Sequence, residues 1–410
     1  MARKKTKQRK IKPKKLKKNL TMDDFKDVKQ MLFENLQKDG KKELKEAELA
    51  EGSMEVDELN KYEALNRIDD IIKHMVKSIK IKGETAFKVP QRSASNIIYD
   101  EIHDLLLLGK KKSVKNLLSL TSAEDATRLM RVIELIYELL EKDIHATKRE
   151  IFYGDVNLFK DQRYSDNCIE DASTLLRTTR NSTHVVASAR GAAIGRLKIR
   201  DRNDIIDLTT LGSGGWSITP MLDKIEIIES DAEFVLVLEK DAAMMRLAEA
   251  RYWRDFPCII LTGKGAGDIA TRMFVKKINK VLKLPTFALM DADPYGHYIY
   301  SVFIRGSKRL SYESPFLATS DMRLLGVLSK DLEEYSVPEN CRIPMNKRDK
   351  KRLNEMLSEE FIKNNKKWYE DLKLMKQMNV KAEIQALSSH GFEYLTETYL
   401  PNKIESADWI

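Results

Sequence analysis

Short apolar runs that alternate with helical segments constrain this 410-residue sequence more than any other feature. The runs at 234–238 (FVLVL) and 287–290 (FALM) are typical of strands buried on both faces of a parallel sheet. A helical pattern follows each run, and this succession predicts a mainly parallel sheet with right-handed crossovers. A further strand is expected at 322–327. The series comprises strands within 234–240, 257–265 and 286–294 and helices within 241–253, 268–282 and 295–307.

Carboxylates follow two of these strands directly. Glu239 ends the first run, and Asp291 and Asp293 end the third. The carboxyl edge of such a sheet is where open α/β folds bind ligands. Three neighbouring carboxylates repel each other unless a cation neutralises them, and oxygen ligands without His or Cys favour Mg²⁺. The sequence therefore predicts a magnesium site, although an Asp-x-Asp at a strand end can also form only a turn or a helix cap.

Charge is distributed unevenly along the chain. The formal net charge is +9, but residues 1–18 hold 11 Lys or Arg and no acid, and subtracting 11 from 9 leaves −2 for the remainder. A basic arm at 1–20 either binds polyanions without sequence preference or serves solubility or targeting. Three cysteines without CxxC spacing indicate a reducing environment. Since no apolar stretch reaches the roughly 20 residues of a membrane span and no secretory signal is visible, an intracellular protein without membrane contact is expected.

The N-terminal half has helical patterns. Apolar residues recur near a 3.6-residue period at 56–79, which predicts a helix that packs on its own domain or on a partner. Three short helices are expected in 97–143, the first from Asn96, the second at Leu117–Leu118 and the third after a cap at Ser122.

A winged-helix DNA-binding module is the interpretation of these helices and the segment after them. Its hairpin would join strands at 183–187 (THVVA) and 193–199 (AIGRLKI) through a turn at Arg190–Gly191. Scattered surface arginines explain the basic residues of this segment equally well. The expected phosphate contacts are Arg177, Arg180, Arg190 and Arg196.

The expected fold is thus α/β plus winged helix. The domains would be a basic extension at 1–55, a helical segment at 56–80, a winged-helix domain at 81–210 and a metal-binding domain at 220–410, with a Gly-rich linker at 211–220. No Gly-x-x-x-x-Gly-Lys-Ser/Thr pattern occurs, so any ATP hydrolysis would come from a partner. The charged C-terminal segment 346–410 is expected to be mostly helical. It would dock on the sheet through Ile384, Leu387, Phe392, Tyr394 and Leu395.

The segment KREIFY holds a candidate nucleophile. Tyr153 lies four residues after Arg149, so the two share one face of a helix. A neighbouring guanidinium favours a phenolate and can hold a phosphate oxygen, which makes the pair credible for attack on a phosphodiester. The adjacent Phe152 cannot attack. A tyrosine beside a phenylalanine near an amphipathic helix is, however, most often part of a protein core.

Five motifs in order resemble the A subunits of DNA topoisomerase VI and the related meiotic double-strand-break transesterase. They are KREIFY, LEKDAA, TGKGAGDIATR, MDADPYG and KAEIQALSSHGF, and the resemblance covers roughly residues 60–410. It implies that Tyr153 is the nucleophile and Arg149 its helper. It also implies that Glu239, Asp291 and Asp293 bind Mg²⁺ in the fold called Toprim. Lys264 and Arg272 are further candidates for the DNA path.

The resemblance also implies partners and a reaction. A homodimer would pair with a GHKL-type ATPase B subunit in an A2B2 heterotetramer, with ATP bound by that partner. It would cut both strands of duplex DNA with short overhangs through 5′-phosphotyrosyl links, as an ATP-dependent type II topoisomerase. The alternatives are a break-forming transesterase that does not reseal, a Toprim nuclease or primase, and a DNA-binding scaffold.

Two details depart from the family pattern. Phe152 stands where many members have a second tyrosine, which leaves Tyr153 as the sole candidate at that place. MDADPYG and LSSHGFEYLTE are closer to eukaryotic forms, such as those of plants, than to most archaeal ones. The nucleus is the expected compartment for a eukaryotic source, and the cytoplasm or nucleoid for an archaeal one.

Overall fold

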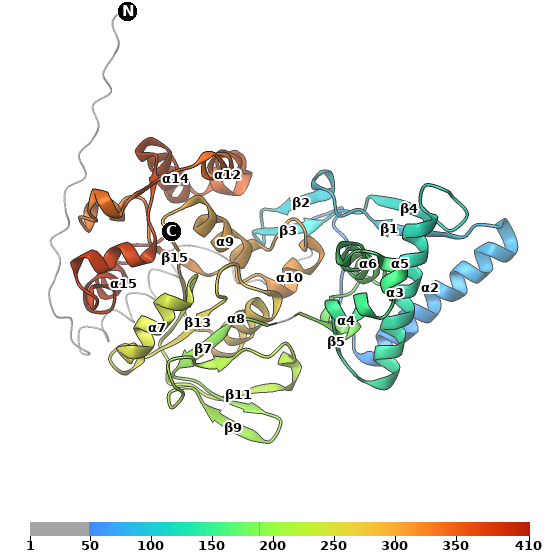
Figure 1. The fold of residues 1–410 in the computed structure, drawn as a ribbon, viewed down its shortest axis with the longest axis horizontal. Helices are drawn as coiled ribbons and strands as arrows, with labels where there is room; N and C mark the ends of the chain where they lie inside the picture. Colours follow the sequence, from blue (N-terminus) through green and yellow to red (C-terminus); the bar gives the residue numbers. More distant parts are fainter. Residues whose placement is uncertain (1–48, 188) are drawn as a thin grey trace, which may run out of the picture.

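The computed structural model describes residues 49–187 and 189–410, so the predictions for the basic arm concern residues outside the described part. Figure 1 shows two lobes. We call residues 61–186 the N-terminal lobe and residues 192–410 the C-terminal lobe. No helix in the described ranges is long and apolar enough to cross a membrane.

A six-stranded sheet forms the centre of the C-terminal lobe, with strand order β10-β7-β13-β12-β14-β15. The last four strands in that order are parallel to one another, whereas β7 and β10 pair antiparallel. The predicted parallel sheet is therefore confirmed. Its strands are β7 (Ala192–Gly195), β10 (Trp216–Ser217), β12 (Phe234–Leu238), β13 (Cys258–Thr262), β14 (Thr286–Leu289) and β15 (Arg323–Gly326).

The strands are apolar throughout because both faces of the sheet are covered. Val235 and Val237 pack into one core with helices α8 and α9, and Leu236 packs into a second core with α7 and the C-terminal segment. This alternation follows from side chains pointing to opposite faces of a strand. The helices of the lobe are α7 (Asp241–Glu249), α8 (Ile269–Leu282), α9 (Pro294–Arg305), α10 (Ser314–Leu317), α11 (Asp331–Glu334), α12 (Lys347–Ser358), α13 (Glu360–Asn364), α14 (Lys366–Met378) and α15 (Leu400–Glu405).

The predicted hairpin of the winged helix is wrong. Strand β7 pairs antiparallel with β13 in the large sheet, and β6 pairs parallel with β5 in the N-terminal lobe. At Gly195, where φ is +104°, a Cβ would lie 2.4 Å from the carbonyl oxygen of Cys258, so only glycine fits. Residues 192–195 thus lie in the sheet, and we propose a domain boundary near 187–191 instead of 211–220.

Two smaller strand pairings complete the C-terminal lobe. Strands β8 (Lys198–Asp201), β9 (Asp204–Asp207) and β11 (Ile225–Glu229) form a three-stranded antiparallel sheet, and β16 (Ile343–Pro344) pairs with β17 (Val380–Lys381). The C-terminal segment is mostly helical, as expected. Ile384, Leu387 and Leu395 are buried in the sheet's second core, with Tyr394 partly buried against it. Phe392 is 66% exposed, so its predicted docking is wrong.

The N-terminal lobe is built around α3, a 20-residue helix that begins after Ser122 as predicted. The helix expected at 56–79 is α2, and it packs on this lobe through Ala64, Ile68 and Met75. Lobe elements are α2 (Lys61–Lys82), β1 (Ala86–Pro90), β2 (Ile97–Asp100), β3 (Leu105–Leu108), β4 (Lys112–Asn116), α3 (Ala123–Lys142), β5 (Ala146–Thr147), α4 (Lys148–Tyr153), α5 (Val156–Phe159), α6 (Gln162–Leu175) and β6 (Val185–Val186).

Two of the three helices predicted in 97–143 are wrong. The segment from Asn96 forms the hairpin β2–β3, and Leu117–Leu118 lie in a turn after β4. Asp100 shapes the hairpin turn because its carboxylate accepts hydrogen bonds from the backbone N–H of Ile102 and of His103. The hairpin lies on the side of the N-terminal lobe that faces the C-terminal lobe in Figure 1. Strand β3 packs against Tyr312 and Ala318 of the C-terminal lobe.

Candidate active site

Tyr153 is the last residue of helix α4. The helix begins with a capping box, in which Thr147 and Glu150 satisfy each other's backbone N–H groups. Ile151 is buried and fixes the helix on the N-terminal lobe, and this leaves the Tyr153 side chain 67% exposed. Arg149, one turn earlier, is exposed as well. Neither Tyr153 nor Arg149 has a side-chain hydrogen bond or ion pair within the part of the chain that the structure describes, so both are free to meet a substrate.

The buried carboxylate of Glu170 fixes the start of helix α4 through Lys148. Lys148, its first residue, donates to Glu170 at 3.1 Å, and Glu170 on α6 is 1% exposed. Arg92 also donates to Glu170, and Arg309 of the C-terminal lobe approaches it at 2.8 Å. Glu170 therefore connects the helix that carries Tyr153 with the lobe that carries the acids.

We expect Glu170→Ala to destabilise the protein by about 1–3 kcal/mol. It removes the buried carboxylate that Arg92 and Lys148 share, and leaves Arg92 with Asp171 and Lys148 with Asp166 as their remaining partners. Denaturant unfolding monitored by circular dichroism measures this. The control is Glu138→Ala, which breaks an exposed pair with Lys142 on α3 and should change stability little. Equal effects of the two substitutions would show that Glu170 does not anchor the lobes.

The predicted metal ligands lie at the carboxyl edge of the sheet. Glu239 directly follows β12, and Asp291 follows the neighbouring strand β14. The backbone N–H of Asp291 donates to Glu239 Oε2 at 2.9 Å. Asp293 is the N-cap of α9, and its Oδ1 accepts from the N–H of Gly296 at 2.6 Å. Parallel neighbouring strands thus bring Glu239 and Asp291 together, with Asp293 two residues further along. In the described residues, however, the three acids do not form a group whose ligand oxygens all lie within 4.8 Å of one another, so the metal site stays a prediction.

The electrostatics of this edge favour a cation. Burial, together with the charges of Asp291 and Asp293, raises the pKa of Glu239 to about 7. Burial and the charge of Asp291 also raise the pKa of Asp293 above its usual range. A divalent ion would stabilise the ionised carboxylates, and an oxygen-only donor set suits Mg²⁺. The donor chemistry therefore suits a magnesium ion, and one ion held by all three acids would require their side chains to move closer together than they lie in this structure.

Lys240 is a site residue that the sequence predictions missed. Its ammonium lies 2.8 Å from Asp291 Oδ2 and 2.9 Å from Glu383, and the N–H of Ile384 donates to Asp291 Oδ1 at 2.9 Å. The motifs LEKDAA and KAEIQALSSHGF contain these residues, so their positions in the family motifs were the available signal. Lys240 partly neutralises the acids in the structure.

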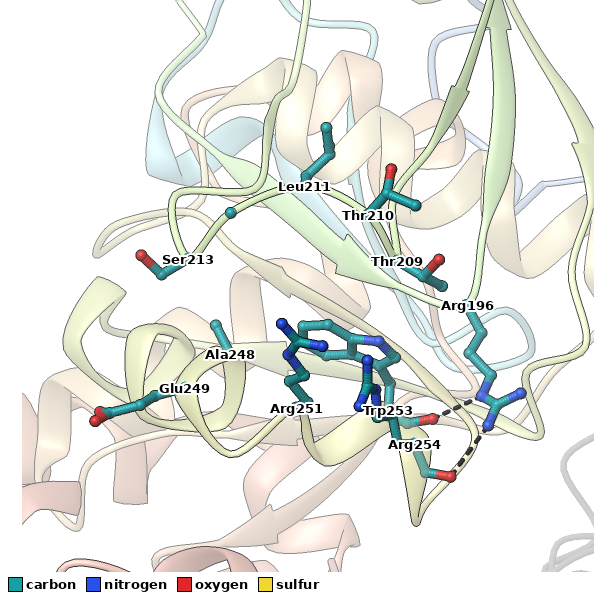
Figure 2. Close-up of a pocket in the computed structure, with 11 residues that line it drawn as sticks. Arg196, Thr209, Thr210, Leu211, Ser213, Ala248, Glu249, Arg251, Trp253 and Arg254 are labelled. Carbon is teal, nitrogen blue, oxygen red and sulfur yellow. Dashed lines mark hydrogen bonds between the residues drawn. The ribbon is translucent and has the colours of Figure 1, made fainter.

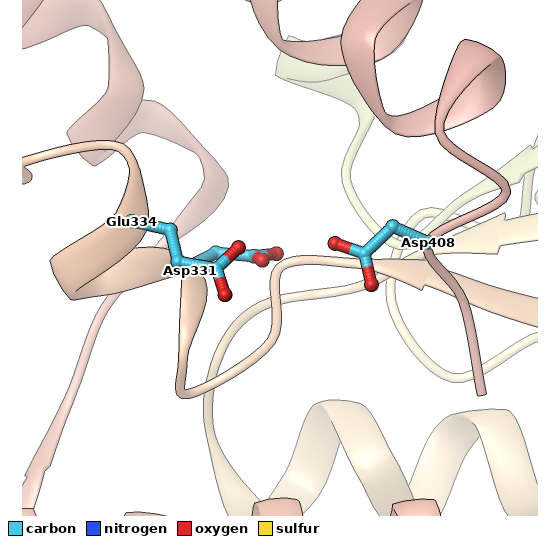
Figure 3. A group of neighbouring side chains, drawn as sticks. All are labelled: Asp331, Glu334 and Asp408. Carbon is cyan, nitrogen blue, oxygen red and sulfur yellow. The ribbon is translucent and has the colours of Figure 1, made fainter. Parts of the chain in front are cut away.

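A second acidic group is structural. Asp331, Glu334 and Asp408 have carboxylate oxygens within 4.8 Å of one another (Figure 3). Lys403 is fully buried between them and donates to Asp331 at 3.1 Å and to Asp408 at 3.0 Å. Since Lys330 also pairs with Asp408, two lysines offset two of the three negative charges of this group, and both of them contact Asp408.

Three of the arginines predicted to contact DNA are either buried or already bonded within the protein. Arg180 and Arg272 are only 6% and 3% exposed, so in this conformation their side chains do not face a DNA path. Burial lowers the pKa of Arg272 to about 10. The Arg196 guanidinium is bonded to Asp231 and to the backbone carbonyls of Trp253 and Arg254. Arg177 and Arg190 are exposed, and Lys264 lies beside Asp241. Their contacts with DNA stay predictions.

Comparisons with known proteins support the same interpretation. The Toprim domain common to the topoisomerase 6 A subunit and Spo11 matches residues 234–404, and the type IIB DNA topoisomerase family matches residues 124–185. The A3 subunit of DNA topoisomerase 6 from Oryza sativa subsp. indica is 48% identical over 345 residues, which cover 84% of this chain and 78% of that protein.

Archaeal and animal relatives are more distant. The A subunit of type 2 DNA topoisomerase 6 from Saccharolobus shibatae is 37% identical over 87% of this chain and 98% of that protein. Meiotic recombination protein SPO11 of Mus musculus is 33% identical over 85% of this chain and 89% of its own length. The chain therefore belongs to the family of type IIB DNA topoisomerases that comprises the topoisomerase 6 A subunits and Spo11.

Proposed function

We propose that this chain is the DNA-cleaving subunit of an ATP-dependent type II topoisomerase, with Tyr153 as its nucleophile. The observation that carries the proposal is an exposed phenol at the end of an anchored helix, in a chain that also gathers three acids at a sheet edge. The names of its relatives support the same activity.

In the proposed reaction, the phenolic oxygen of Tyr153 attacks a backbone phosphorus and gives up its proton. The bond from phosphorus to the 3′-oxygen breaks, and this oxygen takes up a proton. The product is a 5′-phosphotyrosyl link and a free 3′-hydroxyl, which reseals the strand by the reverse reaction. Arg149, one turn before Tyr153, can stabilise the phenolate and hold a phosphate oxygen.

Glu239, Asp291 and Asp293 would hold Mg²⁺. The ion supplies charge stabilisation at the phosphate and the leaving oxygen. Lys240 would keep Asp291 oriented and would limit the repulsion among the acids.

We also propose that the working site is shared between two copies of the chain. Figure 1 shows α4 in one lobe and β13 and β15 in the other. These two strands belong to the same sheet as β12 and β14, which lead to the acids. A homodimer that pairs the tyrosine of one protomer with the acids of the other would complete the site without unfolding either lobe. The winged-helix class of the N-terminal lobe, which would present DNA to this site, remains part of the proposal.

ATP would act through a separate GHKL-type partner, giving an A2B2 assembly, since the sequence contains no P-loop. The nucleus or the nucleoid, according to the source, is where such an enzyme meets DNA.

Relaxation of supercoiled plasmid tests the proposal. We expect relaxed topoisomers only when the chain, a GHKL-type partner, Mg²⁺ and ATP are all present. Covalent protein–DNA breaks without any relaxation would favour the break-forming transesterase instead. Cleavage that leaves no protein on the DNA would indicate a nuclease.

A further inference from the structure

A pocket of about 710 Å³ lies between the loop 209–213 and the short 3₁₀ helix Tyr252–Arg254 (Figure 2). The end of α7 closes one side, and Arg196 closes another. Its volume falls in the range of pockets that hold small ligands or single groups of larger ones. None of the predicted catalytic residues lines it.

The pocket and the acids lie at opposite edges of the large sheet. Trp253 and Arg254 lie five and four residues before the start of β13 at Cys258, whereas Glu239 directly follows β12. The two strands are parallel, with Phe234 paired to Cys258, so their starts share one edge and their ends share the other. A strand of five residues spans roughly 16 Å, which sets the scale of the separation. A ligand in this pocket is therefore remote from the cleavage chemistry.

Two arginines supply unbalanced positive charge. Arg251 and Arg254 are exposed, and neither guanidinium has a hydrogen bond or ion pair within the described ranges. They are three residues apart at a 3₁₀ helix, where side chains at that spacing stand above one another. Figure 2 shows both side chains directed toward the loop 209–213.

The other charged groups of the pocket are already satisfied. Arg196 is paired with Asp231 at 2.6 Å, and Glu249 is paired with Arg246 at 3.1 Å. The hydroxyl protons of Thr209 and Thr210 are donated to Asp207, so neither threonine offers the pocket a donor. The pocket therefore offers two free guanidiniums to an anion. Paired guanidiniums match the oxygens of a phosphate group, which they can hold by charge-assisted hydrogen bonds.

We propose that this pocket binds one backbone phosphate of duplex DNA, away from the site of cleavage, through Arg251 and Arg254. The choice of DNA rests on the proposed function; the choice of a phosphate rests on the pocket itself. Such a contact would hold DNA on the amino edge of the sheet and would leave the reaction at the carboxyl edge unchanged.

DNA binding by the full chain in EDTA tests this, because no metal-dependent cleavage then occurs. We compare the wild type with the double variant Arg251→Gln, Arg254→Gln by fluorescence anisotropy of a labelled duplex over a range of salt. The slope of log K against log salt is negative, and the loss of one phosphate contact should make it less steep by roughly 0.9. Affinity should fall roughly tenfold, as expected for a lost charge-assisted contact.

The matched control is Arg348→Gln, Lys350→Gln, which removes two exposed positive charges from α12. It should keep the wild-type salt slope. Equal slopes for the pocket variant and the control would overturn the proposal. So would tight binding of ATP or inorganic phosphate that depends on the pocket arginines while DNA binding does not. A failure of the proposed cleavage mechanism would leave these binding results unaffected, so the two can be separated.

Discussion

The Tyr153→Phe variant is expected to form no covalent complex with DNA, while it folds and binds DNA as the wild type does. The substitution removes only a hydroxyl group that is solvent-exposed and makes no hydrogen bond within the described residues. No stability cost is therefore expected. Loss of an enzyme's nucleophile typically lowers its rate by factors near 10⁴ to 10⁶, so cleavage should fall below detection.

Denaturing gels of end-labelled duplex, incubated with chain, partner, Mg²⁺ and ATP, report this directly. Tyr164→Phe is the matched control, since Tyr164 is also exposed and lies nearby on α6. The control should form covalent complexes at the wild-type level. A persistent complex with Tyr153→Phe would mean that another residue attacks the phosphate.

The second large effect concerns the acids. We expect Asp291→Asn to raise the Mg²⁺ concentration needed for cleavage by at least about tenfold to 100-fold, because even indirect partners of a metal contribute that much. The fold should survive, because Lys240 keeps its contact with Glu383 at 2.9 Å. Calorimetric Mg²⁺ titration of the DNA-free protein measures binding independently of activity.

Glu334→Gln provides the comparison for Asp291→Asn. It removes one charge from the second acidic group, in which Lys403 and Lys330 already pair with the other two acids, Asp331 and Asp408. We expect its Mg²⁺ response to equal that of the wild type. An unchanged response of Asp291→Asn, or a changed response of Glu334→Gln, would contradict the assignment of the metal site.

The C-terminal lobe could be predicted from sequence because its information is local. The run at 234–238 is apolar at every position, which only a strand covered on both faces requires, and an acid follows it directly. In the neighbouring helices, apolar residues recur at the helical period of about 3.6 residues. Parallel strands then bring Glu239 and Asp291 together without any further information.

The errors arose where distant contacts decide the structure. The pattern at Leu105–Leu108 suggested a helix, but the segment is a strand held by Tyr312 and Ala318, about 200 positions later in the chain. Strand β7 joins the sheet because Gly195 fits against Cys258, a fit that no local pattern shows. The pocket of Arg251 and Arg254 likewise needs a loop from another part of the chain.

Mass-spectrometric mapping of the trapped DNA–protein complex tests the central claim most directly. Trypsin cutting after Arg149 and Lys160 gives a peptide, EIFYGDVNLFK, whose only tyrosine is Tyr153. After nuclease digestion, we predict a nucleotide attached through its 5′-phosphate to that tyrosine. A nucleotide on any other residue, or cleaved DNA with no peptide attached, would contradict the account.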